Sequence, residues 1–147
     1  MNQRLFRVRA LVSAPMPRVA SLLLAAHQGP VSELNARLFD WAPGANLEGG
    51  PECFRYVSSH GKGTVHVDPV SISYRGGWWY RCTYSLKPVS GGTDVTMTID
   101  DVSRVPRWAA WLANRGFTGL AEQSAKEFET RLRTAARDVG SELAFFP

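Results

Sequence analysis

The strongest constraint on the fold is a pair of alternating segments on either side of a short loop. Residues Trp78–Lys87 (WWYRCTYSLK) and Thr93–Val102 (TDVTMTIDDV) are both rich in β-branched and aromatic residues. The residues between them include VSGG, which suits a four-residue hairpin loop. The pattern therefore predicts an antiparallel hairpin in which Pro88 faces Thr93.

This register gives sensible partners on both faces of the hairpin. One face pairs Leu86 with Val95, Tyr84 with Met97, Cys82 with Ile99, and Tyr80 with Asp101. The other face pairs Lys87 with Asp94, Ser85 with Thr96, Thr83 with Thr98, and Arg81 with Asp100. Apolar pairs, Thr–Thr pairs and opposite charges are favourable across strands, and a one-residue slip would destroy both sets. The tyrosine-containing face is therefore the one we expect to be buried.

The segment before this hairpin predicts one strand and two short helices. Phe6 to Val12 alternate within a half-buried strand from Leu5 to Ala14. Pro17 opens a helix that stops at Gly29-Pro30. A second short helix is expected from Ser32, a candidate N-cap, to about Trp41.

Between Glu52 and Arg75 the sequence predicts two more hairpins. A four-residue HGKG turn would place Tyr56 opposite Val67, and a turn at Asp68-Pro69 follows. A three-residue loop or bulge at Gly76-Gly77 would place Tyr74 beside Trp78. That turn decides whether Trp78 or Trp79 faces inward.

The C-terminal part predicts a long amphipathic helix. Its apolar stripe at helical spacing contains Phe117, Leu120, Ala121, Ser124, Phe128, Leu132 and Ala135. This helix is the large apolar element available to cover one face of the sheet. With 147 residues, the chain is expected to form a single α+β domain over residues 1–147.

The predicted inner face carries all four tyrosines of the chain together with Asp101. A dry core would need a hydrogen-bond partner for each hydroxyl and for the carboxylate. A mostly apolar surface with a few convergent polar groups is typical of a ligand cavity. The alternative is a filled core whose tyrosines reach the rim or bond backbone groups.

Composition argues against several classes of protein. The net charge of +4 comes from basic residues that form no run, so nucleic-acid binding is not expected. Two cysteines without metal-ligand spacing, and the lack of phosphate-loop or dinucleotide motifs, predict no metal and no cofactor. The longest apolar run is too short for a membrane span, and no signal peptide opens the chain. We therefore expect a cytoplasmic protein.

The sequence resembles the START-like helix-grip superfamily (SRPBCC), which includes polyketide cyclases, lipid-transfer proteins and pathogenesis-related allergens. VRALVSAPMPRVASLL resembles its first strand and helix, GGTDVTMTIDD its late strand, and the C-terminal helix its gripping helix. The resemblance covers nearly the whole chain, and Ala20 stands where a bulky aromatic is usual. It implies a curved antiparallel sheet of six to seven strands wrapped around the long helix. It also implies a deep apolar cavity whose mouth lies at Ser32–Trp41.

The candidate catalytic residues are Asp101 and Tyr80. A desolvated aspartate can act as a general base, and a tyrosine hydroxyl can polarise a carbonyl or stabilise an enolate. The alternative is that Asp101 is solvated at a strand end or caps the next segment. The candidate substrate-binding residues are Tyr56, Tyr74, Trp78, Cys82, Tyr84, Met97 and Arg115.

These residues support two functional hypotheses. The first is a polyketide cyclase or dehydratase-like enzyme of bacterial biosynthesis that binds an apolar or aromatic small molecule. The second is a non-catalytic carrier or sensor of a hydrophobic ligand. The outer face, with Trp79 among Arg81 and Thr83, leaves a homodimer open.

Overall fold

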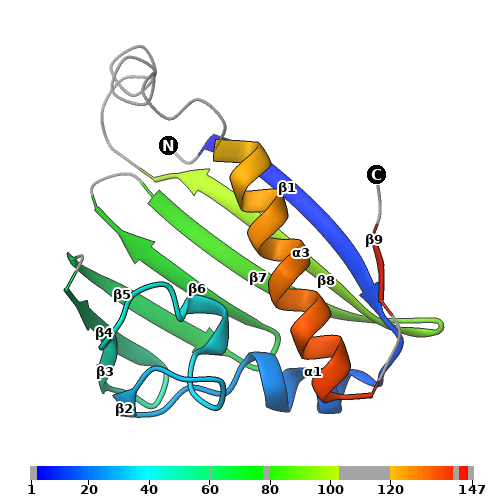
Figure 1. Cartoon of the computed structure of the whole chain (residues 1–147), viewed down its shortest axis with the longest axis horizontal. Coiled ribbons are helices and arrows are strands. Elements are labelled where there is room, and N and C mark those ends of the chain that lie inside the picture. The colour runs from blue at the N-terminus through cyan, green and yellow to red at the C-terminus, as the bar shows by residue number, and fades with distance from the viewer. Residues whose placement is uncertain (1–2, 60, 78–79, 103–119, 141–142, 146–147) are drawn as a thin grey trace.

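The computed structural model describes residues 3–59, 61–77, 80–102, 120–140 and 143–145. Within them, one antiparallel sheet of nine strands runs in the order β2-β3-β4-β5-β6-β7-β8-β1-β9 (Figure 1). The strands are β1 (Gln3–Val12), β2 (Gly29–Pro30), β3 (Asn46–Gly49), β4 (Cys53–Ser58), β5 (Gly61–Asp68), β6 (Ser71–Gly76), β7 (Tyr80–Val89), β8 (Gly92–Asp101) and β9 (Leu143–Phe145). The six predicted strands correspond to β1 and β4 to β8, and the three additional strands are short.

Two α-helices accompany the sheet in the described residues, α1 (Met16–Leu23) and α3 (Leu120–Asp138). Figure 1 shows α3 lying across one face of the sheet, over β7, β8 and β1. We call the face covered by α3 the inner face and the opposite one the outer face. The predicted α+β architecture, a helix-grip arrangement of sheet and long C-terminal helix, is therefore confirmed.

The central hairpin β7–β8 has the predicted register. Tyr84 pairs with Met97 and Cys82 with Ile99, and the ladder continues to Val89 and Gly92. The hairpin turn is therefore shorter than expected, although every predicted partner is retained. β1 joins β8 with its alternating apolar residues on the same inner face, with Val8 opposite Met97.

The registers of the preceding hairpins differ from those predicted. Tyr56 pairs with Gly63 instead of Val67, because β5 begins at Gly61 and the β4–β5 connection is two residues long. At the next turn, Asp68 pairs with Ser71. The Asp68 carboxylate accepts hydrogen bonds from the Val70 backbone N–H and the Ser71 hydroxyl, each at 2.8 Å, which fixes Pro69-Val70 as the turn.

The prediction that Tyr74 lies beside Trp78 is also wrong. Tyr74 pairs with Cys82, and Gly76 pairs with Tyr80, so the connection begins after Gly76. The observed register differs from the predicted one by an even number of residues, so Tyr74 still faces inward. Its cross-strand partner is the small Cys82 side chain instead of the large ring of Trp78. Trp78 and Trp79 lie outside the described residues, so the structure does not test which of them faces inward.

The core lies between the inner face and α3. Phe128 and Leu132 of α3 are fully buried, and Ser124 and Ala135 of the predicted stripe are buried with them. The Phe128 ring stacks on Tyr84 with centroids 6.2 Å apart. Leu120 lies on α3, but the side chains of 120–122 and residue Phe117 fall outside what the structure describes.

The second predicted helix is absent; residues 32–41 instead form a tight turn followed by the 3₁₀ turn Arg37–Phe39. Ser32 and Asn35 exchange backbone hydrogen bonds, and the Ser32 hydroxyl accepts from the Leu34 N–H at 3.2 Å. Ala36 then adopts a left-handed conformation, with φ of 49°. Ser32 therefore caps a turn and not a helix, because local side-chain bonds to the backbone compete with helical ones.

Candidate ligand site on the inner face

The four tyrosines converge on the inner face, as the alternation predicts. Tyr56 and Tyr84 are each only 2% exposed, whereas Tyr74 and Tyr80 are half-buried. Tyr74 and Tyr56 make an edge-on ring contact with centroids 5.1 Å apart, and Tyr80 lies 6.3 Å from Tyr74. The row forms a continuous aromatic wall from β4 to β7.

Two glycines make room for this wall. Gly63 and Gly76 are paired across β5 and β6. A Cβ atom built on either glycine would lie about 2.5 Å from Tyr74 ring atoms, which is far inside contact distance. The absence of side chains at these two positions therefore allows the Tyr74 ring to lie over the sheet.

Residues of the segment after α1 cover the wall. Phe39 is fully buried, and its ring lies 5.8 Å from Tyr74 and 5.9 Å from Tyr84. Trp41 packs edge-on against Tyr74 at 4.7 Å. The Tyr56 hydroxyl donates a hydrogen bond of 2.8 Å to the Phe39 carbonyl oxygen. Part of the inner face is thus filled by this protein's own aromatic side chains, and the buried Tyr56 hydroxyl is satisfied by backbone.

A pocket of about 410 Å³ lies beside this cluster, between α3 and the segment 33–40. Its lining consists of Glu33, Arg37, Leu38, Asp40, Lys126, Glu127, Thr130, Arg131 and Thr134. The volume is within the roughly 300–1,000 Å³ typical of small-molecule sites. Balanced charges and two threonine hydroxyls give the pocket many hydrogen-bonding groups.

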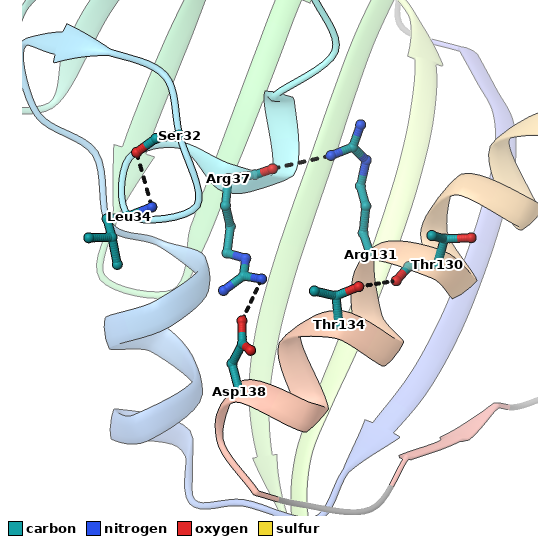
Figure 2. Close-up of polar contacts among 7 residues, drawn as sticks. All are labelled: Ser32, Leu34, Arg37, Thr130, Arg131, Thr134 and Asp138. Atoms are coloured by element: carbon teal, nitrogen blue, oxygen red, sulfur yellow. Dashed lines mark hydrogen bonds and ion pairs between the residues drawn. The ribbon is translucent and has the colours of Figure 1, made fainter.

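Two arginines tie the walls of this pocket together, as Figure 2 shows. The buried guanidinium of Arg37 forms an ion pair of 2.8 Å with Asp138 at the end of α3. Arg131 reaches from α3 to donate a hydrogen bond of 3.2 Å to the Arg37 carbonyl oxygen. These contacts hold the 3₁₀ turn against the helix and define the pocket's width.

The electrostatics connect this pocket with the tyrosine wall. Burial raises the pKa of Tyr80 and of Tyr84 far above the ordinary value near 10, and raises the pKa of Cys82 to about 12. The negative charge of Glu127 adds to all three increases, while Arg131 opposes those of Tyr84 and Cys82. The hydroxyls therefore stay protonated near neutral pH and can act as hydrogen-bond donors, not as bases.

A second pocket, of about 330 Å³, opens at the edge of the wall. Its lining includes Trp41, Tyr56, Tyr74 and Lys62. The two pockets have no lining residue in common. Two of the predicted substrate-binding residues, Tyr56 and Tyr74, therefore border a pocket.

The predicted catalytic pair lies close together in the sheet. Asp101 and Tyr80 are partners across β7 and β8, as predicted, and Asp101 is only 5% exposed. Neither residue lines the two pockets just described. Arg115, like Trp78, lies outside the described residues.

The sheet ladder brings the remaining predicted binding residues together. Met97 and Cys82 are buried beside Tyr84, in the middle of the inner face.

Among the described residues there is no group of three or more His, Cys, Asp or Glu side chains that could hold a metal. Nor is any described helix long and apolar enough to cross a membrane.

None of the residues that line the pocket beside α3, Glu127 and Arg131 among them, was predicted as a site residue, and neither were Phe39 and Trp41. Glu127 and Arg131 immediately precede the stripe residues Phe128 and Leu132 and lie one helical turn apart. This spacing puts them on one flank of the apolar stripe, a signal that could have identified them. Phe39 and Trp41 fall within Ser32–Trp41, where the family resemblance implies the cavity mouth, but neither was predicted as a site residue.

Comparison with solved structures supports the fold. An uncharacterized protein from Rhizobium leguminosarum has a TM-score of 0.51 at 18% sequence identity, covering 94% of this chain and 96% of that chain. The Aha1 dimer from Colwellia psychrerythraea has a TM-score of 0.43 at 11% sequence identity, covering 84% of this chain and 92% of that chain. A Polyketide_cyc-like protein from Corynebacterium glutamicum has a TM-score of 0.42 at 12% sequence identity, covering 95% of this chain and 87% of that chain. The first similarity shows a shared fold, and the other two scores are too low to support any argument.

No protein-family model matches the chain, and no curated protein matches it in sequence. Function must therefore be argued from the site itself, since one fold serves many activities.

Proposed function

We propose that this protein binds an aromatic small molecule bearing carbonyl and hydroxyl groups, in the pocket between α3 and the segment 33–40. The observation that carries the proposal is the 410 Å³ pocket, which is lined by Glu127 and Arg131 of α3 and by Leu38 and Asp40, the two neighbours of the buried Phe39. The fold resemblance noted from the sequence is consistent with a ligand-binding role. The bound molecule would enter where the 3₁₀ turn meets α3.

The pocket's polar groups suit a ligand of this kind. A guanidinium has five N–H donors, and the hydrogen bond to the Arg37 carbonyl engages one of those of Arg131. The remaining donors can bind a ligand carbonyl oxygen, while the Glu127 carboxylate can accept from a ligand hydroxyl. Leu38 offers the apolar contact that an aromatic ring needs.

A fluorescent hydroxy-ketone, 6-acetyl-2-naphthol, is a suitable probe. We expect saturable binding, with Arg131→Gln weakening the affinity about tenfold through loss of a charge-assisted hydrogen bond. Arg133→Gln is the matched control, because Arg133 lies on the same helix, carries the same charge and is exposed beside Glu129. Equal affinities for wild type and both variants would contradict the proposed site.

A catalytic role is the second candidate, motivated by the buried Asp101 opposite Tyr80. In this scheme Asp101 removes a proton from a carbon next to a ketone, and the Tyr80 hydroxyl donates a hydrogen bond to the resulting enolate oxygen. The enolate carbon attacks a second ketone of the same molecule. Asp101 returns the proton to the new alkoxide, and loss of water completes an aldol cyclisation and dehydration.

The reaction can be tested with heptane-2,6-dione, which would yield 3-methylcyclohex-2-enone and water. We expect Asp101→Asn and Tyr80→Phe to abolish the conversion while 6-acetyl-2-naphthol still binds. Conversion that survives both substitutions would remove these residues from the mechanism. Binding without conversion in the wild type would favour the carrier or sensor role.

A further inference from the structure

The outer face of β1, β7 and β8 gathers basic residues that are scattered in the sequence. Arg4, Arg7 and Arg9 stand on β1, and Arg81 and Lys87 stand on β7. Because β8 lies between these two strands, the long side chains form two ridges beside it. The ridges border a groove of about 590 Å³ whose floor is β8.

The acidic residues of the floor neutralise the two ends of this groove. Asp100 lies between Arg4 and Arg81, with N–O distances of 3.4 and 3.7 Å. Asp94 forms an ion pair with Arg9 nearer the other end. Two carboxylates against five basic side chains leave the groove with a net positive charge.

The centre of the groove carries hydrogen-bond donors that have no partner within the part of the chain that the structure describes. Arg7 pairs with Thr98 across the sheet, and Thr98 pairs with Thr83, so the three form one rung. Among the described residues, Arg7 makes no ion pair, and neither threonine hydroxyl makes a hydrogen bond. On the outer-face rung beside it, the buried Nε of Arg81 also has no partner among the described residues. The neighbouring Ser85 adds a further hydroxyl beside this rung.

We propose that this rung binds a phosphate-type oxyanion. A tetrahedral anion presents several acceptor oxygens and can satisfy a guanidinium and two hydroxyls that converge from adjacent strands. Side chains on one rung start about 5 Å apart, a spacing that a single phosphate group can bridge. The groove is much larger than one phosphate, so the anion is best supplied as part of a larger phosphate ester. This site is on the opposite face from the aromatic ligand pocket and does not depend on it.

Nuclear magnetic resonance titration with inorganic phosphate at physiological salt tests the site directly. We expect saturable shifts of the Thr98 and Thr83 methyl groups and of the Arg81 Nε–H. Arg7→Gln should weaken binding about tenfold, and Thr98→Val a few-fold, since one charge-assisted and one neutral hydrogen bond are lost. Arg18→Gln removes the same charge from the exposed surface of α1 and should leave the affinity unchanged.

Two further probes distinguish the source of the phosphate. Tighter binding of phenyl phosphate than of inorganic phosphate would identify a soluble ester. Co-sedimentation with phosphatidylcholine vesicles containing phosphatidic acid, abolished by Arg7→Gln, would identify a lipid headgroup. Equal phosphate affinity in wild type, Arg7→Gln and Arg18→Gln would overturn the proposal, as would shifts that map away from the rung.

Discussion

The two faces of the central sheet use the same strands for different purposes. On the inner face, Tyr84 and Met97 are paired, buried and covered by Phe128. One residue along each strand, Thr83 and Thr98 are paired on the outer face, where the neighbouring groups are charged. Alternation thus separates the stabilising contacts from the outward-facing hydroxyl donors within a single hairpin. The comparison predicts large stability effects for inner-face substitutions and small ones outside.

The largest effect is expected where α3 meets the inner face. Phe128→Ala removes a fully buried ring and should lower the free energy of unfolding by about 3–5 kcal/mol. Lys126→Ala, at an exposed position of the same helix, should change it by less than about 0.5 kcal/mol. Urea denaturation of both variants measures the difference. Similar small losses in both would mean that α3 does not cover the inner face.

The buried thiol gives the inner face a pH dependence. The pKa of Cys82 is about 12 in the folded protein and 9.0 ordinarily, so the unfolded thiol loses its proton first as pH rises. Its contribution to stability is therefore complete below pH 9 and is lost progressively toward pH 12. The raised pKa values of the four tyrosines act in the same direction.

Denaturation curves between roughly pH 8 and roughly pH 11 test this linkage, with an expected loss of about 2 kcal/mol or more near the upper end. Cys82→Ser removes the thiol and should reduce the slope. Cys53→Ser changes an exposed cysteine and should leave the slope as in the wild type. Identical slopes in all three proteins would show that Cys82 is not desolvated.

A single hydroxyl on the inner face has a smaller expected effect. Tyr56→Phe leaves the Phe39 carbonyl without its buried partner and should destabilise the protein by about 1–2 kcal/mol. Tyr74→Phe removes a hydroxyl that makes no hydrogen bond among the described residues, so its effect should be below about 0.5 kcal/mol. Equal effects of the two substitutions, measured by thermal unfolding, would argue against the contact between Tyr56 and the 3₁₀ turn.

The smallest effect is expected on the outer face. Asp100→Asn breaks the ion pairs with Arg4 and Arg81, both of which are partly solvated. The loss should be about 1 kcal/mol or less at low salt and should shrink further as salt is added. A large, salt-independent loss would mean that the outer face contributes to stability as the inner face does.

The sequence predicted which side chains face inward better than it predicted their partners. The β7–β8 register was correct because both faces supply matched pairs, and only one alignment satisfies both. The β4–β5 and β6–β7 registers slipped by an even number of residues, which keeps every side chain on its face. Alternation alone does not detect such slips, and the glycines at 61, 63 and 76 belong to strands instead of turns.

The candidate site on the inner face was only partly predictable. The tyrosine wall followed from the alternation, but its cover did not. The position of Phe39 depends on Asn35, whose buried side chain bonds the backbone of His27, Gly29 and Pro30 and anchors the turn. The outer-face rung was not predicted from the sequence either. Arg7 of β1 and Thr83 of β7 come together only because both pair with Thr98 of β8.

The most direct test of the central claim is the location of the bound aromatic probe. Intermolecular nuclear Overhauser effects from 6-acetyl-2-naphthol should reach the methyl groups of Leu38, Thr130 and Thr134, which line the pocket between the 3₁₀ turn and α3. Their appearance together, with Arg131→Gln weakening binding and Arg133→Gln leaving it unchanged, is the predicted result. Effects confined to the outer-face methyl groups of Thr83 and Thr98 would contradict a ligand site between the 3₁₀ turn and α3.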